Sequence, residues 1–232
     1  MIGKDFPPNN FELFGLNLTD PSDFIYNMVL ATTCFLLAYK VRKLGTHTLF
    51  YKGWWLFFLY LGISTFYGGF GHVFFNYFNV YGKLLSWIFA PISIYWAEIA
   101  MISVHKNSKF VKSVKRIFLV KLILVYLAII VIWGLVDVLQ KPQIPFLPNA
   151  INSIVGLLIG VGIASIVYHK TQHKNFRYFY FGILAILPSA FIFLMKINLH
   201  KWFTKNDFSH LLMLFGIVFF YFGVEKLHKA KQ

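Results

Sequence analysis

The sequence predicts an all-α polytopic membrane protein, one bundle of seven transmembrane helices preceded by a short polar arm. Of the 232 residues, 58% are hydrophobic and only 13% are charged, and the mean hydropathy is +0.65. Soluble domains are much less apolar. Seven apolar runs of about 20 residues, the length that crosses a hydrocarbon core, follow an arm of residues 1–23 in a single domain of residues 24–232. The expected helices are residues 24–41, 53–72, 84–104, 117–136, 151–168, 179–195 and 208–224.

Positive charge predicts the orientation of the bundle. Sixteen of the 22 Lys and Arg residues fall on one side of the expected helices. Because cytoplasmic loops retain Lys and Arg, we expect the N-terminus outside and the C-terminus in the cytoplasm. The abundance of Lys, Phe, Ile and Asn favours a bacterial source, hence the inner (plasma) membrane. The basic clusters are short and lie between apolar runs, which is typical of loops beside a membrane and excludes a nucleic-acid groove. We therefore expect membrane lipids as partners and no nucleic acid.

The second expected helix ends in an informative stretch. Ser64, Gly68 and His72 recur at four-residue spacing and so form one stripe that reaches the outer edge at His72. Small residues in such a stripe let another helix approach closely. A packing seam with a solvated histidine at its end is the simpler interpretation, and a ligand position is the alternative.

The third expected helix contains Pro91, which should kink it, and Glu98. An ionisable side chain inside a membrane segment is by default a functional candidate that faces the bundle interior. Since this helix runs from outside to inside, Glu98 lies deeper than His72. A salt bridge with an inner-side cation such as Lys40 or Lys121 is therefore an equally good interpretation.

The next helices show packing signals. Asn149 and Asn152 follow a Pro-rich turn and look like cap and rim residues. Gly156 and Gly160 form a small-residue ladder typical of close helix packing. Pro188 should kink the sixth helix as Pro91 kinks the third, and such kinks often widen a bundle around a cavity.

The last helix opens with Asn206-Asp-Phe-Ser-His210. Asp207 and His210 are three residues apart, so both project from one face about one turn apart. If the second and seventh helices are neighbours, with the first closing the ring between them, His72 joins this pair near the outer face. Two imidazoles and one carboxylate are a recognised zinc set that leaves one position for water.

Zinc would lower the pKa of that water and make it a nucleophile for a lipid ester or amide. We therefore predict His72, Asp207 and His210 as metal ligands. Ser64, Glu98 and Asn206 are the candidate catalytic residues, and His200 is a further candidate beside the ligands.

On these residues the chain resembles the seven-helix membrane hydrolases that include the alkaline ceramidases and the adiponectin and progestin receptors. In that superfamily one His near the end of helix 2 and two His on one face of helix 7 hold zinc, with a Ser and an Asp nearby. The resemblance implies the same role for His72 and for Asp207 with His210. The chain also resembles an uncharacterised bacterial seven-helix family, through Gly68-Gly69-Phe-Gly-His72 and Asn206-Asp207-Phe-Ser-His210.

The chain departs from the ceramidase pattern at several positions. The Ser expected four residues before the helix 2 His is Gly68, no acid opens the third helix, and Asp207 replaces one His. Three functions stay open: a zinc-dependent membrane hydrolase, a non-catalytic receptor-like or lipid-binding bundle, and a transporter. No internal repeat supports the last.

Overall fold

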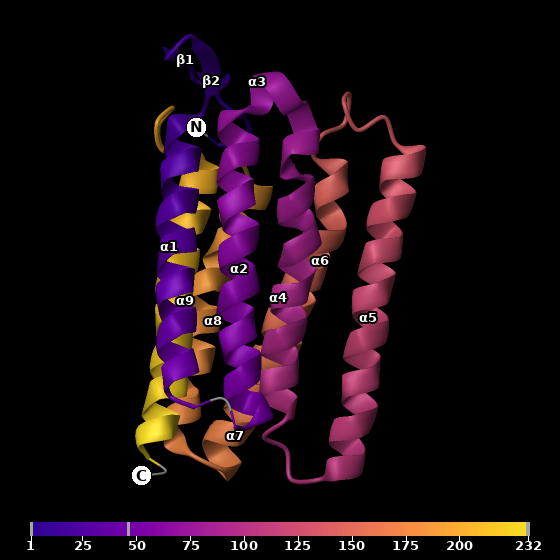
Figure 1. Cartoon of the computed structure of the whole chain (residues 1–232), viewed down its shortest axis with the longest axis vertical. Coiled ribbons are helices and arrows are strands. Elements are labelled where there is room, and N and C mark those ends of the chain that lie inside the picture. The colour runs from indigo at the N-terminus through magenta and orange to yellow at the C-terminus, as the bar shows by residue number, and fades with distance from the viewer. Residues whose placement is uncertain (1, 46, 231–232) are drawn as a thin grey trace.

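A computed structural model describes residues 2–45 and 47–230, and in it the helices run side by side as a single elongated bundle (Figure 1). The described part of the chain contains seven helical spans that are long and apolar enough to cross a membrane. Each expected helix overlaps one of them, which confirms the prediction of an all-α, seven-helix membrane protein. The spans are α1 (Pro21–Lys43), α2 (Leu49–Val73), α3 (Phe75–Phe78) with η1 (Asn79–Lys83) and α4 (Leu84–Ile102), α5 (Ser108–Leu135), η2 (Ile144–Phe146) with α6 (Leu147–Val155), η3 (Gly156–Ile163) and α7 (Ala164–Thr171), η4 (Lys174–Phe176) with α8 (Arg177–Leu194), and α9 (Lys205–Lys229).

All seven spans begin earlier than their hydropathy predicts, and for two of them the sequence at the start gives the reason. α5 starts at Ser108 because the side chain of Asn107 accepts a hydrogen bond from the Phe110 amide and so caps the helix before the apolar run begins. In the fifth span, Pro148 stands at the start of α6. Asn149 is therefore inside the helix, and the expectation that it caps the helix at the rim is wrong.

Aromatic side chains fill the centre of the bundle. Trp54 of α2 stacks on Phe179 of α8, with ring centroids 4.8 Å apart, and lies 5.3 Å from Phe220 of α9. All three side chains are fully buried. The backbones of α8 and α9 approach closely, since a Cβ on Gly182 would lie 2.8 Å from the carbonyl oxygen of Gly216. These contacts hold α2, α8 and α9 around one core.

The arm forms a β-hairpin, which the sequence pattern did not suggest. β1 (Asn10–Leu13) pairs antiparallel with β2 (Leu16–Thr19), and the hairpin stands above one end of the bundle (Figure 1). We call this end the hairpin end. The arm is fastened to it by hydrogen bonds from Thr19 Oγ1 to the His72 carbonyl, 2.7 Å, and from the Asn9 side chain to the Lys201 carbonyl, 2.6 Å.

α5 stands at the edge of the bundle (Figure 1), and Ile129 is its only buried residue. Two polar contacts tie it to α4: the Tyr126 hydroxyl donates to the Ile88 carbonyl at 2.6 Å, and Lys121 Nζ lies 2.5 Å from Glu98 Oε1. The predicted pairing of Glu98 with an inner-side cation is thus confirmed for Lys121. Most of the α5 surface is therefore not covered by other helices.

Candidate polar site at the hairpin end of the bundle

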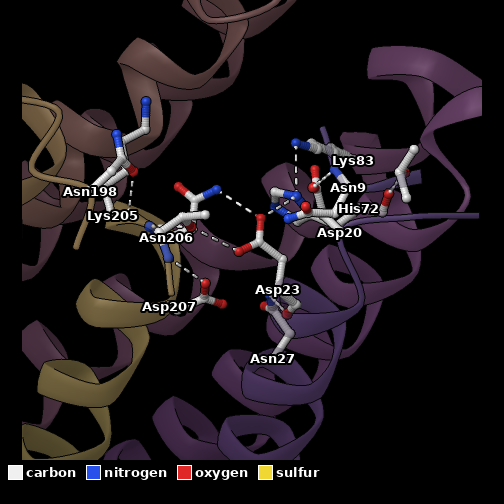
Figure 2. Close-up of polar contacts among 12 residues, drawn as sticks. Asn9, Asp20, Asp23, Asn27, His72, Lys83, Asn198, Lys205, Asn206 and Asp207 are labelled. Carbon is white, nitrogen blue, oxygen red and sulfur yellow. Dashed lines mark hydrogen bonds and ion pairs between the residues drawn. The ribbon is translucent and has the colours of Figure 1, made fainter. Parts of the chain in front are cut away.

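Asp23 is the centre of a buried polar network at the hairpin end (Figure 2). It lies in the first turn of α1 and is 2% exposed. His72 Nδ1, from the last turn of α2, lies 3.0 Å from Asp23 Oδ2, and the Asn206 amide of α9 donates to the same oxygen at 2.8 Å. The Thr204 hydroxyl donates to Oδ1 at 3.3 Å. One carboxylate therefore joins α1, α2 and the start of α9.

The ring of His72 is oriented by charged neighbours. Its Nδ1 faces the Asp23 carboxylate at 3.0 Å and the Lys83 ammonium at 3.4 Å. Because an ionised carboxylate can only accept a hydrogen bond, the closer contact assigns the proton to Nδ1. In the neutral ring Nε2 then carries the lone pair and is the nitrogen that can take a proton or bind a metal.

The first turn of α9 holds Asp207 in place. Thr204 is the N-cap of α9. Its hydroxyl accepts a hydrogen bond from the backbone N–H of Asn206 at 3.2 Å, and its own backbone N–H donates to Asp207 Oδ2 at 2.7 Å. This is a capping box, in which the cap residue and an acid three positions later satisfy each other's backbone. Asp207 is fully buried, at 0% exposed. Only its second oxygen, Oδ1, is left for another partner.

Two buried polar atoms at this site have no hydrogen-bond partner among the described residues, Asp207 Oδ1 and His210 Nδ1. Both residues interact electrostatically with Asp23. An unpaired buried polar atom costs about 1–3 kcal/mol, so such atoms usually mark a place for water, an ion or a ligand. We call Asp23, His72, Asn206, Asp207 and His210 the hairpin-end cluster.

Two acids of the arm, Asp5 and Asp20, also lie at the hairpin end. Burial raises the pKa of Asp20 above its ordinary value; the hydrogen bond from the Asn9 amide opposes this rise, and the charge of Asp23 adds to it. Burial alone would also raise the pKa of Asp5, but its contacts with Lys205 at 2.5 Å and Lys196 at 3.2 Å outweigh burial and hold that pKa below its ordinary value.

The structure brings together four of the residues predicted for the site: His72, Asn206, Asp207 and His210. Ser64 lies two turns before His72 on α2 and donates to the Ser86 carbonyl at 2.9 Å, so its hydroxyl serves the packing of α2 on α4. His200 accepts from the Trp202 amide through Nδ1 at 3.2 Å. Neither side chain forms a hydrogen bond or an ion pair with the cluster among the described residues.

Asp23 is not among the predicted site residues, because the arm was expected to extend to it. Two signals could have found it: an acid at the start of a membrane helix, and Asn27 one turn later on the same face. Asn27 is buried, and its side-chain amide donates to the Asp23 carbonyl at 2.8 Å. A Cβ on Gly68 would lie 3.2 Å from Asn27 Oδ1 and 3.3 Å from Ser86 Oγ, so these two side chains line the space that a larger residue at position 68 would need.

The donor atoms that could bind a metal are spread over the site. In residues 2–45 and 47–230, no group of three or more His, Cys, Asp or Glu side chains is gathered around a point where a metal ion could sit. The donor types are still those of a zinc site, with two imidazoles and a carboxylate. Two of the three, Asp207 and His210, carry buried atoms that lack a partner.

A model of a family of unknown function (DUF6962) matches residues 22–229. The chain belongs to this family. The match begins one residue before Asp23 and runs past His210, so every residue of the hairpin-end cluster lies within the part that defines the family. No curated protein and no solved structure matches the chain.

An aromatic groove of about 380 Å³ lies between α2, α3 and η1, on the face of α2 opposite His72. Phe70 and Phe74 flank His72 in the sequence and line the groove, and Gly82, next to Lys83, closes one side. The groove lies within membrane-spanning segments. Its lining is suited to a hydrocarbon chain.

Glu98 lies away from the cluster, twelve residues along α4 from Ser86, or about 18 Å at the rise of an α-helix. It is 1% exposed, and Oε2 has no hydrogen-bond partner among the described residues. Asn149 and Asn152 of α6 are 2% and 3% exposed, and all four of their amide atoms also lack partners. α4, α5 and α6 pack against one another, and we call the polar residues Glu98, Lys121, Asn149 and Asn152 on these three helices the lateral seam.

Proposed function

We propose that this protein is a membrane hydrolase that acts on a lipid ester or amide at the hairpin-end cluster, with zinc as its cofactor. The observation that supports this most is the pair of unpaired buried atoms, Asp207 Oδ1 and His210 Nδ1, beside a histidine oriented by a buried carboxylate. Buried polar atoms are expensive to leave unsatisfied. Their presence beside His72 favours a bound ion and water over a packing role.

The side chains of the cluster have distinct tasks in this proposal. His72, Asp207 and His210 would hold the zinc, which when bound supplies an acidified water as the nucleophile. Asp23 accepts a hydrogen bond from the Nδ1–H of His72, and a bond of this kind usually fixes the tautomer of a metal-binding histidine. Asn206 holds Asp23 in place through its amide.

The likeness to the ceramidase-type hydrolases adds support. His72 ends the second span, and Asp207 and His210 share a face at the start of the last one. Where that superfamily has a serine this chain has Gly68, and the Ser86 hydroxyl reaches the same space. The aromatic groove on the opposite face of α2 has room for an acyl chain, which favours a lipid as the substrate.

We further propose that the hairpin end faces the outside of a bacterial plasma membrane. The last turns of α1 and α9, both at the opposite end, are basic, with Lys40, Arg42 and Lys43 in α1 and Lys226, His228 and Lys229 in α9. Cytoplasmic ends of membrane helices carry such charge. A fluorescent protein that matures only in the cytoplasm should therefore be bright when fused to the C-terminus, and a dark fusion would reverse the orientation.

A non-catalytic, receptor-like or lipid-binding role is the second candidate. The capping box favours it, since Asp207 already has a structural task in starting α9. In this case the cluster would join α1, α2 and α9 without chemistry, and the aromatic groove would bind a lipid that is released unchanged.

Metal content of purified protein separates the two candidates. We expect about one zinc per chain in wild type and its loss in His72→Ala and in His210→Ala. His200→Ala is the matched control, because this histidine lies at the same end and outside the cluster. Wild type that stays metal-free after zinc is added back would reject the hydrolase. If zinc is present, a panel of lipid esters and amides should show zinc-dependent release of fatty acid.

A further inference from the structure

A second site lies at the other end of the bundle, between α4 and α5. A groove of about 550 Å³ opens there, lined by the last part of α4, the loop after it and the first three turns of α5. The hairpin-end cluster takes no part in it. Its polar lining comes from Tyr95, Ser103, His105 and Ser108 and from four cations, Lys106, Lys112, Lys115 and Arg116.

The groove has a strongly positive lining. No acid is among its lining residues, and none of its four cations forms an ion pair with any residue that the structure describes. Ser108, Lys112, Lys115 and Leu119 follow spacings of four, three and four residues, so one face of α5 points into the groove. The N-terminus of α5 adds the positive end of a helix dipole. These features together favour an anion.

Hydrocarbon surface continues directly from the charged part. Leu119 lines the deep end of the groove, and beyond it α5 presents Ile123, Leu124 and Leu127, each about half exposed. A ligand that is anionic at one end and apolar at the other matches a cationic groove that is followed by an apolar helix face. Inorganic phosphate would contact only the cationic part of the groove.

We propose that this groove binds the headgroup of an anionic phospholipid, with the acyl chains lying along α5. Basic pockets between membrane helices recognise such headgroups by their phosphate oxygens. Arg116 can hold two oxygens of one phosphate at once, and Lys112 and Lys115 add charge from the neighbouring turns.

Thermal unfolding in a neutral detergent, with and without added phosphatidylglycerol, tests the proposal. We expect phosphatidylglycerol to raise the Tm of wild type and phosphatidylcholine to leave it unchanged. The variant Lys112→Gln/Lys115→Gln/Arg116→Gln should bind phosphatidylglycerol about 100-fold more weakly, because each cation near an anionic lipid contributes about fivefold. Native mass spectrometry should show the lipid retained on wild type and lost from this variant.

The variant Lys170→Gln/Lys174→Gln/Arg177→Gln is the matched control. It removes the same number of cations at the same end, from the segment around η4, outside the groove. Phosphatidylglycerol should still raise the Tm of this control. It should also raise the Tm of Lys112→Arg/Lys115→Arg/Arg116→Lys, a variant that preserves the positive charge of the groove. Equal loss in both Gln variants, or no preference for phosphatidylglycerol in wild type, would overturn the proposal. A full shift with inorganic phosphate alone would assign the groove to a soluble anion and overturn it as well.

Discussion

The hairpin-end cluster and the lateral seam each contain a buried carboxylate, Asp23 and Glu98. Both regions also contain buried polar atoms without a partner among the described residues, but the two carboxylates themselves are satisfied differently. Both oxygens of Asp23 have partners, contributed by His72, Thr204 and Asn206. In the lateral seam Glu98 has one cation on one oxygen, and the amides of Asn149 and Asn152 have no partner among the described residues.

The difference follows from helix packing. α1 lies between α2 and α9 and packs on both, so donors reach Asp23 from two sides. α5 packs along only part of one face, and the one side chain of α5 that pairs with Glu98 is Lys121. Polar groups in a well-packed region can stabilise the fold through shared hydrogen bonds, whereas the same groups beside a poorly packed helix remain a cost.

The largest expected effect breaks the hairpin-end cluster at its centre. Asp23→Ala removes the acceptor of His72, Asn206 and Thr204 at once, and removing one partner of a buried ion pair alone costs about 3–5 kcal/mol. Thermal unfolding in detergent should show the greatest loss of stability among single substitutions of polar residues. Asp137→Ala, which removes an acid that caps only its own turn, is the control, and an equal loss there would show that Asp23 is not the centre.

The next prediction concerns the ion pair of the lateral seam. Glu98→Leu leaves the Lys121 ammonium without its partner and should cost about 3–5 kcal/mol. The double variant Glu98→Leu/Lys121→Met should recover most of this loss, because neither side chain has another ion-pair or hydrogen-bond partner among the described residues. The stabilities of the single and the double variant, measured by thermal unfolding in detergent, test this prediction. If the double variant is as unstable as the single one, Glu98 has a further partner in the bundle.

A smaller effect, of opposite sign, is expected for the amides of the seam. Leu has nearly the shape of Asn, and replacing an unpaired buried amide by an apolar group of similar shape is neutral or stabilising, by up to about 1–3 kcal/mol. Asn149→Leu and Asn152→Leu should therefore keep or raise the Tm. Asn206→Leu, which loses the bond to Asp23, should lower it. A clear drop in Tm for both seam variants would instead indicate water or a ligand bound to these amides.

The smallest effect is in the arm. The pKa of Asp5 in the folded protein lies below its ordinary value of 3.8, so its ion pairs stabilise the folded arm above that pH and are lost as pH falls through the lowered pKa. Asp5→Asn should lower the Tm slightly at neutral pH and not at all in strong acid. The Tm of wild type and of Asp5→Asn, measured from neutral pH to strong acid, tests this prediction. A difference in Tm between the two proteins that stays constant with pH would mean that the charge of Asp5 is not involved.

Several features of the molecule could be predicted from the sequence. Runs of apolar residues set the number of spans, and a repeat of four placed Ser64, Gly68 and His72 on one stripe. The spacing of Asp207 and His210 put both on one face of α9, and in the structure both interact electrostatically with Asp23, the partner of His72. These inferences hold because hydropathy and helical periodicity depend on neighbours along the chain.

Other features depend on which helices become neighbours, and only the tertiary structure decided them. The sequence left Lys40 and Lys121 as equal partners for Glu98, and packing of α5 on α4 selected Lys121. Asn149 and Asn152 looked like rim caps, and the early start of α6 turned them inward. Asp23 became the centre of the site because α1 lies between α2 and α9. Composition and spacing determined the helices and their faces, while contacts between residues far apart in the chain, which no local pattern encodes, determined what each face meets.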